Sequence, residues 1–444
     1  MKSPLNNLFT IAVITGLSLP ATVDATNGYF LIGYGSKARG MAGAGVAYPQ
    51  DGLAAAYNPA GMAEVKTRFD IGGDIFAPEL AVKHNSAVLP ADEKSHGRYF
   101  PVPAMGGTYT YNDEITFGFA FVGAGLMTDY DQKVSASTPS YLFNFNGNSG
   151  GQAGVRLIQM QVLPSIAYKL NNKHTVGASI SIAMQTFRSE GIQSFEQDAL
   201  GYTAGSGGTS NEGWDWSYGG GIRLGYLGKF MDDDLTLGAN YSSRVWMTEF
   251  KDYDNLFAEQ GDFDIPPATT IGLAYKVTPD INVVFDIQYV QYEEIASVAN
   301  KGPVNNDPIN FFPAGIDVLG LDNGMGFGWV NQTIYKLGMD FKYNEKTTLR
   351  GGWNYGKTPV PDDQILFAML APATVEHHLT LGATYQWSDD IEVSMNYMHA
   401  FKKTITGKTV FWPDGVSNFE DLTEDNAAIA MSQNSIGIGL GIKF

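Results

Sequence analysis

The sequence predicts an all-β protein, a transmembrane antiparallel β-barrel of about 14 strands with an N-terminal hatch, or plug, inside its lumen. Three observations lead to this fold class. Many segments alternate apolar residues with small or polar ones, the pattern of a wall between lipid and a lumen. The connections between these segments alternate between short and long. The chain also starts with an export signal and ends on an aromatic residue, Phe444.

The export signal occupies residues 1–25. Lys2 supplies a positive start, residues 8–19 form a short apolar run, and small residues precede a cleavage point after Ala25. The run is shorter than the roughly 20 apolar residues that a membrane-spanning helix needs. The signal is therefore predicted to be removed during export rather than to anchor the chain.

We expect the mature protein to begin at Thr26, because the residues before it fit a signal peptidase site. N-terminal sequencing of protein taken from the outer membrane checks this. Retention of residues 8–19 in that material would contradict both the export signal and the barrel.

Composition excludes several other classes. The chain of 444 residues has no cysteine, so this exported protein must hold together without disulfides. A net charge of −18 with no basic stripe excludes nucleic acid as a partner. A mean hydropathy of −0.12 excludes a bundle of membrane helices, whereas a barrel needs only alternate residues to be apolar.

The alternating segments begin after residue 66 and continue to the end of the chain. Their number is even, as in single-chain bacterial barrels. They are 69–75, 105–111, 115–121, 158–168, 176–182, 216–226, 235–241, 271–275, 281–289, 335–343, 349–355, 379–387, 391–397 and 436–444.

The connections predict two different sides of a membrane. Short ones lie at 112–114, 171–174, 231–234, 278–280, 344–346 and 388–390, and long ones at 78–100, 126–155, 189–213, 248–266, 296–328, 358–374 and 404–431. A soluble β-sandwich is the alternative for any single strand, but it has no reason to sort its loops in this way. The sorting favours periplasmic turns and extracellular loops of a multi-pass protein in a Gram-negative outer membrane. Aromatic residues beside the short turns fit an interfacial girdle: Tyr111, Tyr168, Tyr226, Tyr343 and Trp387.

Residues 26–66 are predicted to form the hatch, and residues 67–444 the barrel. The first segment is rich in small residues and does not alternate. A barrel of this strand number leaves a channel, since side chains already fill one of about eight strands. Asn58 is suited to cap a turn, and Pro59 fixes its own φ and removes a hydrogen-bond donor. An ordinary turn before the first strand is the alternative for these two residues.

Several motifs resemble those of the FadL/TodX family of outer-membrane channels for long-chain fatty acids and other hydrophobic compounds. The matching motifs are Gly28-Tyr29-Phe30, Gly35, Ala38-Arg39-Gly40-Met41-Ala42-Gly43-Ala44-Gly45-Val46-Ala47, Asp51, Tyr57-Asn58-Pro59-Ala60, and segments within 167–172, 357–362 and 396–399. The resemblance implies a fourteen-stranded barrel, a hatch that blocks the lumen, and a kinked third strand that opens a gap toward the membrane.

Site residues follow from this resemblance. It implies hatch or gating roles for Arg39, Asp51, Asn58, Pro59 and Ala60. The kink is expected at Gly123 and Gly125, because glycine tolerates a break in a strand ladder. We expect the segment around Ala60 to lie against the wall near that break.

Candidate ligand contacts come from apolar loop clusters and from cations that face the lumen. The loop residues are Phe143, Phe145, Phe311, Phe312, Leu366 and Phe367, which either bind a hydrophobic solute or pack on one another over the barrel mouth. Arg223 and Arg244 lie on neighbouring predicted strands and are placed to converge on one carboxylate. Alternatively, the lumen cations pair with inward acids such as Asp286, Asp340 or Glu392.

The resemblance implies passive uptake of hydrophobic small molecules by a monomer, with exit into membrane lipid. Long-chain fatty acids are the first expectation, because they are the commonest family substrate. Neutral hydrocarbons, either monoaromatics or alkanes, are the alternative, and a general diffusion porin is the alternative from another class.

An enzyme is not expected, since no set of serine, histidine and acid stands out as catalytic. No cofactor and no metal are expected either. The acidic run with Asp252, Asp254, Asp262 and Asp264 leaves calcium as an alternative, although it lacks the EF-hand spacing. The terminal Phe444 implies the barrel-assembly machinery as a partner.

Overall fold

The computed structural model describes residues 27–84, 91–97, 99–132, 142–143, 151–196, 203, 205–302, 315–407 and 427–444. The expected signal peptide lies outside these residues, as do three candidate ligand contacts, Phe145, Phe311 and Phe312. Among the described residues, every helix is too short or too polar to cross a membrane.

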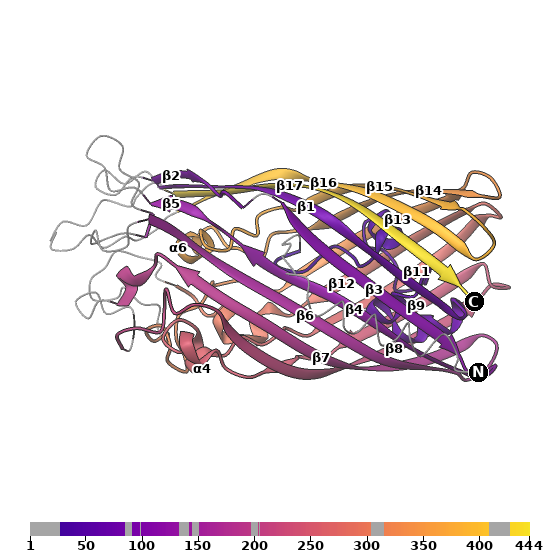
Figure 1. Ribbon diagram of the computed structural model, residues 1–444, viewed down its shortest axis with the longest axis horizontal. Coiled ribbons are helices and arrows are strands. Elements are labelled where there is room, and N and C mark those ends of the chain that lie inside the picture. Colours follow the sequence, from indigo (N-terminus) through magenta and orange to yellow (C-terminus); the bar gives the residue numbers. More distant parts are fainter. Residues whose placement is uncertain are drawn as a thin grey trace, which may run out of the picture.

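The chain forms a closed antiparallel barrel of fourteen long strands, which confirms the predicted fold class (Figure 1). Strands that follow one another in sequence pair with one another, and the last strand pairs with the first. The barrel strands are β1 (Arg68–His84), β3 (Phe100–Thr110), β4 (Ile115–Met127), β6 (Gly151–Lys169), β7 (His174–Glu190), β8 (Asp215–Phe230), β9 (Leu235–Ser242), β11 (Ala268–Thr278), β12 (Ile281–Val290), β13 (Gln332–Lys342), β14 (Thr347–Gly356), β15 (His377–Gln386), β16 (Ile391–Gly407) and β17 (Ala427–Lys443).

Three short strands extend this wall: β2 (Ala91–Lys94) pairs with β1, β5 (Tyr130–Gln132) with β6, and β10 (Trp246–Met247) with β8. Helical turns occupy several of the long connections, and Figure 1 shows α4 and α6 at the end opposite the short turns. These turns are η2 (Gln193–Glu196), η3 (Lys251–Tyr253), α4 (Ala258–Gly261), η4 (Tyr292–Glu294), α5 (Ala296–Ala299) and α6 (Ile365–Ala368).

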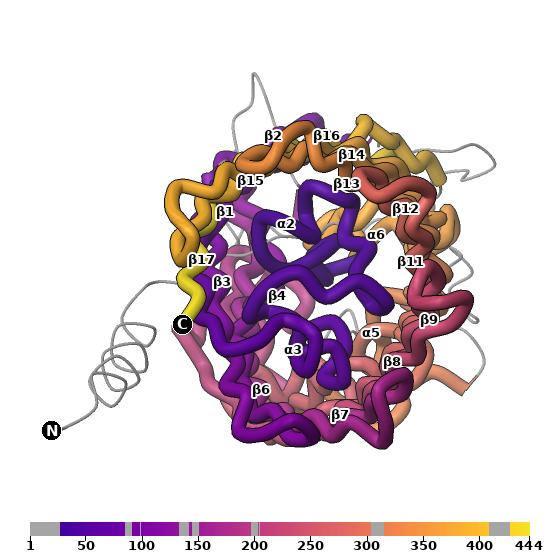
Figure 2. The backbone as a smooth tube through the Cα atoms, turned by 90° about the vertical axis from the view of Figure 1, so that its right-hand side faces the viewer, coloured from indigo at the N-terminus to yellow at the C-terminus, as the bar shows by residue number. Residues whose placement is uncertain are grey.

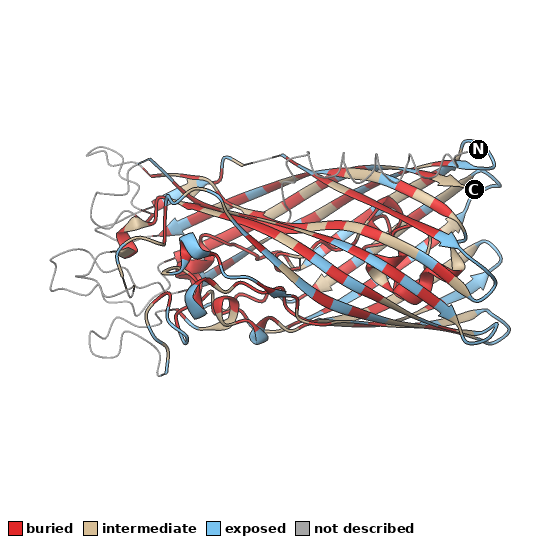
Figure 3. Ribbon diagram, turned by 60° about the horizontal axis from the view of Figure 1, so that its bottom comes forward, coloured by how far each residue is buried: buried red, intermediate tan, exposed pale blue. Residues whose placement is uncertain are grey.

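The last strand carries the predicted alternation. Ile436 and Ile438 are 59% and 57% exposed on the outer face, whereas Gln433 and Ser435 face inward and are buried. β17 pairs with β1 along its whole length, from Arg68↔Lys443 to His84↔Ala427. Alternating exposed and buried bands run along the wall in Figure 3, as the outward-apolar pattern predicts.

The short turns lie where they are predicted, but several strands are longer at the loop end than expected. β1 continues to His84 and β16 to Gly407, into residues predicted as loops. The outward residues there include exposed Glu79 and Lys83. Outside the hydrocarbon layer the outer face need not be apolar, so the alternation ends while backbone pairing continues.

Residues 27–66, here called the luminal segment, lie inside the barrel (Figure 2). They contain three short helices, α2 (Ser36–Arg39), α3 (Ala54–Tyr57) and η1 (Pro59–Glu64). Nearly all of their side chains are buried. The wall therefore encloses a packed N-terminal unit.

Candidate functional site

A buried ionic cluster fixes the luminal segment to one side of the wall. Lys37 of α2 and Arg68 of β1 both donate to the carboxylate of Glu392 on β16. Arg39 lies 3.2 Å from the Asp74 carboxylate and donates to Ser435 at 3.0 Å. Charge-assisted hydrogen bonds between buried groups are among the strongest non-covalent contacts in proteins. The cluster therefore holds α2 against β1, β16 and β17.

Asp51 lies in the same region. Its Oδ1 accepts a hydrogen bond from the Leu53 amide at 3.0 Å, and the adjacent Gly52 amide donates to Asp70 at 2.7 Å. Burial, and then the negative charge of Asp70, raise the pKa of Asp51 to about 6. Asp51 thus stabilises the turn before α3, and the Gly52 amide connects that turn to Asp70 of the charged cluster.

The Asn58-Pro59-Ala60 turn packs against β7 and β8. Asn58 Oδ1 accepts from the Ala60 amide at 3.1 Å, and its Nδ2 donates at 2.8 Å to the carbonyls of Val46 and Tyr226. A Cβ on Gly177 of β7 would lie 2.4 Å from the Ala60 nitrogen, so only glycine permits this approach. The expectation that Ala60 lies near Gly123 and Gly125 is wrong, because Ala60 packs against Gly177 of β7; η1 reaches β4 only farther along, where Met62 lies against Gly118.

The wall has an interruption between β3 and β4. Their ladder runs from Thr110↔Thr116 to Met105↔Phe121 and stops there. Farther toward the loop end, β3 continues to pair with β1 and β4 with β6. The edges meet again where the His96 amide donates to the Asp129 carbonyl at 2.8 Å. We call the stretch in which β3 and β4 do not pair with each other, between residues 100–104 and 122–127, the window.

Gly123 and Gly125 lie on the β4 edge of the window. Gly125 has a φ of +147°, a backbone conformation that strongly favours glycine. Its amide donates to the carbonyl of Tyr29 at 3.3 Å, a contact to the luminal segment in place of one to β3. The two glycines therefore lie where the third strand turns away from the second.

The first residues of the luminal segment cover the window from inside. Leu31 and Ile32 belong to one buried apolar cluster with Phe100 and Val102 of β3. Sequence reasoning did not assign a role to Tyr29, Leu31 or Ile32. The run Tyr29-Phe30-Leu31-Ile32 was the available signal, since it is the bulkiest apolar run in a segment otherwise rich in small residues.

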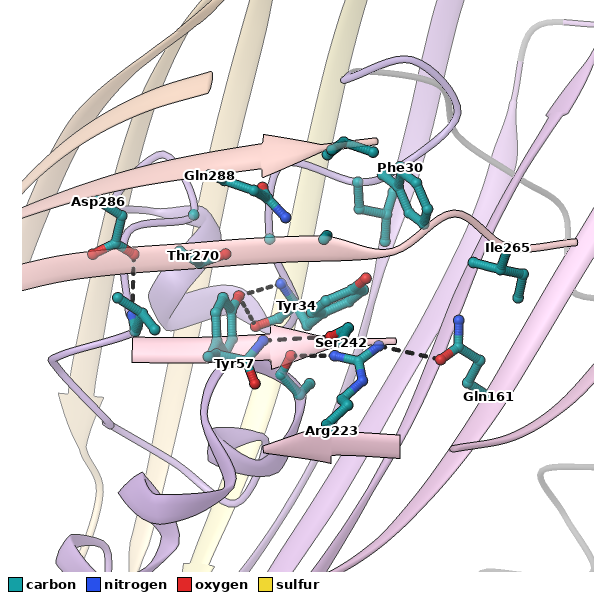
Figure 4. Close-up of a pocket in the computed structure, with 18 of the residues that line it drawn as sticks. Phe30, Tyr34, Tyr57, Gln161, Arg223, Ser242, Ile265, Thr270, Asp286 and Gln288 are labelled. Atoms are coloured by element: carbon teal, nitrogen blue, oxygen red, sulfur yellow. Dashed lines mark hydrogen bonds between the residues drawn. The ribbon is translucent and has the colours of Figure 1, made fainter. Parts of the chain in front are cut away.

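A cavity of about 70 Å³ separates the luminal segment from β6–β13, and we call it the inner cavity (Figure 4). Arg223 enters it from β8 and donates to the Ala56 carbonyl at 2.8 Å and to Gln161 at 3.1 Å. Asp286 accepts from the Gly45 and Val46 amides, at 2.8 and 3.0 Å. Lys336 donates to the Ile32 carbonyl at 3.0 Å. These charged side chains bind mainly the backbone of the luminal segment.

Arg244 is not part of this group. It follows the end of β9 and binds Asp264 and, at 3.1 Å, Asp262, while its Nη1 donates to the Glu294 carbonyl at 3.0 Å. Burial, and then the charge of Asp264, raise the pKa of Asp262 to about 7. The expected convergence of Arg223 and Arg244 on one carboxylate is wrong, because Arg244 binds Asp262 and Asp264 instead. These two acids lie in a loop, and strand periodicity does not predict where loop residues lie.

The described loop candidates Phe143, Leu366 and Phe367 are buried in one apolar cluster at the loop end. Phe195 joins them, with ring centroids 5.9 Å from Phe143 and 5.6 Å from Phe367. In this structure they pack on one another, as the alternative interpretation expects. The same cluster includes Tyr29. Apolar contacts therefore extend without a break from the loops to the residues behind the window.

Comparison with known proteins agrees with this geometry. The model of a family described as outer membrane protein transport protein (OMPP1/FadL/TodX) matches residues 17–435. A search of curated proteins found no match.

Similar solved structures include the Pseudomonas putida toluene transporter TodX, with 20% identity over 94% of this chain and 100% of that chain, and a TM-score of 0.68. The Ralstonia pickettii toluene transporter TbuX has 19% identity, 93% and 99% coverage, and a TM-score of 0.63. A Pseudomonas aeruginosa FadL homologue has 15% identity, 94% and 100% coverage, and a TM-score of 0.65. At these identities the likeness shows the fold.

Proposed function

Because the chain belongs to the outer membrane protein transport protein (OMPP1/FadL/TodX) family, we propose that it admits small neutral hydrophobic compounds passively across the outer membrane. In this proposal residues 27–66 act as the hatch, and Arg39, Asp51 and the Asn58-Pro59-Ala60 turn hold it in place. The window between β3 and β4 is the exit into the membrane, with Gly123 and Gly125 on its edge.

The observation that carries this proposal is the window with an apolar cover. Where β3 and β4 do not pair with each other, their backbone groups need other partners, because an unsatisfied group is costly next to lipid; the Gly125 amide binds the Tyr29 carbonyl. Leu31 and Ile32 pack against the β3 edge of the window, and Tyr29, whose carbonyl binds the Gly125 amide, belongs to the aromatic cluster at the loop end. A solute that moved along this path would avoid the loss of about 0.8 kcal/mol per CH₂ that exposure to water imposes.

The packed lumen argues against a general diffusion porin. The inner cavity of about 70 Å³ is smaller than the ~150 Å³ cavity that holds benzene in an engineered protein. Even a monoaromatic ring therefore needs movement of the luminal segment before it can pass.

The lumen cations favour a neutral solute. Arg223 and Lys336 bind backbone carbonyls, and Arg350 of β14 binds Gln50 and Thr384, at 2.9 and 2.6 Å. One observation keeps fatty acids as the second candidate: the buried Nε of Arg223 has no hydrogen-bond partner among the described residues. A carboxylate in the inner cavity would supply one.

Uptake of toluene and of a long-chain fatty acid, each with and without the protein in otherwise identical cells, tests the proposal. We expect protein-dependent toluene uptake. If the protein increased the uptake of neither compound, the proposed function would be refuted.

Replacing Arg223 with glutamine separates the two substrate classes. We expect the ratio of fatty-acid to toluene uptake to stay unchanged, because a neutral solute does not need the guanidinium. If a carboxylate binds Arg223, the ratio should fall by about tenfold or more, since a charged hydrogen bond contributes ~1.5–3 kcal/mol. Lys276→Gln is the control, because Lys276 is an exposed cation of β11.

A further inference from the structure

A second hollow lies on the outside of the wall, directly behind the inner cavity. This outer pocket has a volume of about 750 Å³, and Arg244, Trp246, Met247 and Asp264 are among the residues that line it. Ser243, Val245, Ile265 and Pro266 line the inner cavity. In residues 243–246 and in residues 264–265, successive residues therefore face opposite hollows, one the inner cavity and the next the outer pocket.

We call residues 243–245 and 264–266 the seam. Because successive residues of an extended chain point to opposite sides, one layer of backbone separates the two hollows here. Ser242 and Ile265 both line the inner cavity, and Figure 4 shows Ser242 beside Arg223. The seam is the partition between the inner cavity and the exterior of the barrel.

The seam has few backbone hydrogen bonds. Val245 and Ile265 exchange two, at 3.0 and 3.2 Å. The next residues, Pro266 and Pro267, have no N–H to donate. Deeper in the wall the same two strands pair continuously from Ser242↔Ala268 to Leu235↔Tyr275.

A bulge lies on the other side of residues 243–245, where they pass β8. Ser242 is opposite Arg223 on β8, and Trp246 is opposite Gly220, so the β9–β10 chain has one more residue between these pairs than β8. A bulge leaves a residue outside the regular ladder and bends its strand. Local opening requires few backbone bonds to break, which is the property of segments that open readily.

Side chains provide the remaining closure. Arg244 binds Asp264 and Asp262 across the outer face of the seam, and the Met247 amide donates to Asp264 at 2.5 Å. The Arg244 side chain is 28% exposed, so the contact is accessible from the outer pocket. Arg244 is therefore positioned as a latch between the β9–β10 chain and the chain leading into β11.

The outer pocket faces the membrane interface. Trp216 and Trp246, which also line it, are 47% and 60% exposed at the loop end of β8 and β10. Exposed tryptophan is typical of the interfacial belt of membrane proteins. The pocket thus combines the apolar faces of two tryptophans, which suit a hydrophobic solute, with a charged lining that includes Glu249, Lys251 and Glu259 beside the Arg244 ion pairs.

We infer that the seam is a second lateral passage, through which small hydrophobic compounds move between the inner cavity and the outer leaflet. It is distinct from the window, because β6, β7 and β8 separate β4 from β9. The inference rests on the proposed function. It adds two features to that function: the outer pocket as a binding site for the solute, and Arg244 as the residue that closes the passage.

The test combines opening of the latch with covalent closure of the seam. Arg244→Ala is expected to raise toluene uptake by up to about fivefold, the change in an equilibrium that loss of a partly exposed ion pair produces. A Val245→Cys/Ile265→Cys pair, added to Arg244→Ala and oxidised, should remove that gain, and reductant should restore it. The native chain has no cysteine, so only the introduced pair reacts.

The matched control is Ala239→Cys/Ile271→Cys, which joins the same strands at a paired position deeper in the wall. Its oxidation should leave the gain of Arg244→Ala intact. The second passage would be overturned if Arg244→Ala did not raise toluene uptake, or if oxidation of the seam cysteines did not remove the gain. In either case, uptake by the wild-type protein would still support the proposed function. Absence of wild-type uptake would instead refute both.

Discussion

Replacement of Gly125 by valine is expected to lower toluene uptake by about tenfold or more in a barrel that still folds. The φ of +147° at Gly125 is a conformation that a β-branched residue avoids. A valine that kept this backbone conformation would cost about 1–3 kcal/mol of stability, and each ~1.4 kcal/mol changes an equilibrium constant tenfold. The β4 strand should therefore straighten toward β3 and narrow the window.

Whole-cell uptake measures the effect, and the shift in gel mobility on heating reports whether the barrel is folded. Gly351→Val in β14 is the matched control. A Cβ there would lie 3.8 Å from the Thr380 carbonyl, an ordinary contact, and the residue has no positive φ. Full uptake by correctly folded Gly125→Val protein would exclude the window as the exit.

The barrel could be predicted because each strand is recognisable from its own residues alone. A lipid-facing residue at every second position identifies a strand without knowledge of its partner, as in the run from Ile436 to Phe444. Short polar turns then fix which strands are neighbours. The same locality explains the errors at the loop end, where β1 carries Glu79 and Lys83 outward and the pattern disappears although pairing continues.

The site depends on contacts that no local pattern encodes. Glycine at 123 and 125 permits a break in β4, but the absence of pairing with β3 is a property of two strands and of Tyr29 behind them. Arg244 has the spacing of a lumen residue, yet a bulge and two loop acids redirect it. Roles carried by Arg39 and Asp51 came from family resemblance rather than from their spacing.

The anchoring of the luminal segment illustrates the same limit over a longer range. Lys37 and Glu392 are 355 positions apart in sequence and become partners only when the barrel closes. Alternation does identify Glu392 as an inward acid. Its partner could not be inferred, because the position of residues 27–66 inside the lumen is set by many weak contacts together.

Replacement of Glu392 by glutamine is expected to release the luminal segment and make the channel leak small polar solutes. The change preserves the shape of the side chain but removes the carboxylate that Lys37 and Arg68 share. Lys443 Nζ also lies 3.3 Å from the other oxygen of this carboxylate. Arg68 keeps its ion pair with Asp70, but Lys37 loses its carboxylate partner. Loss of one partner from a buried ion pair costs about 3–5 kcal/mol, because the remaining charge is left without compensation. A displaced segment should therefore become roughly two to four orders of magnitude more populated.

The barrel itself should persist, since its fourteen strands are held by backbone pairing that does not involve this carboxylate. Conductance in planar bilayers and sensitivity of cells to hydrophilic antibiotics measure the leak, alongside gel mobility as the folding check. Glu345→Gln is the control, because Glu345 is exposed in the short turn between β13 and β14. A folded Glu392→Gln barrel with wild-type conductance would show that the ionic cluster does not hold the segment. Closure would then have to depend on the close packing of Ala60 against Gly177 and on the apolar contacts behind the window.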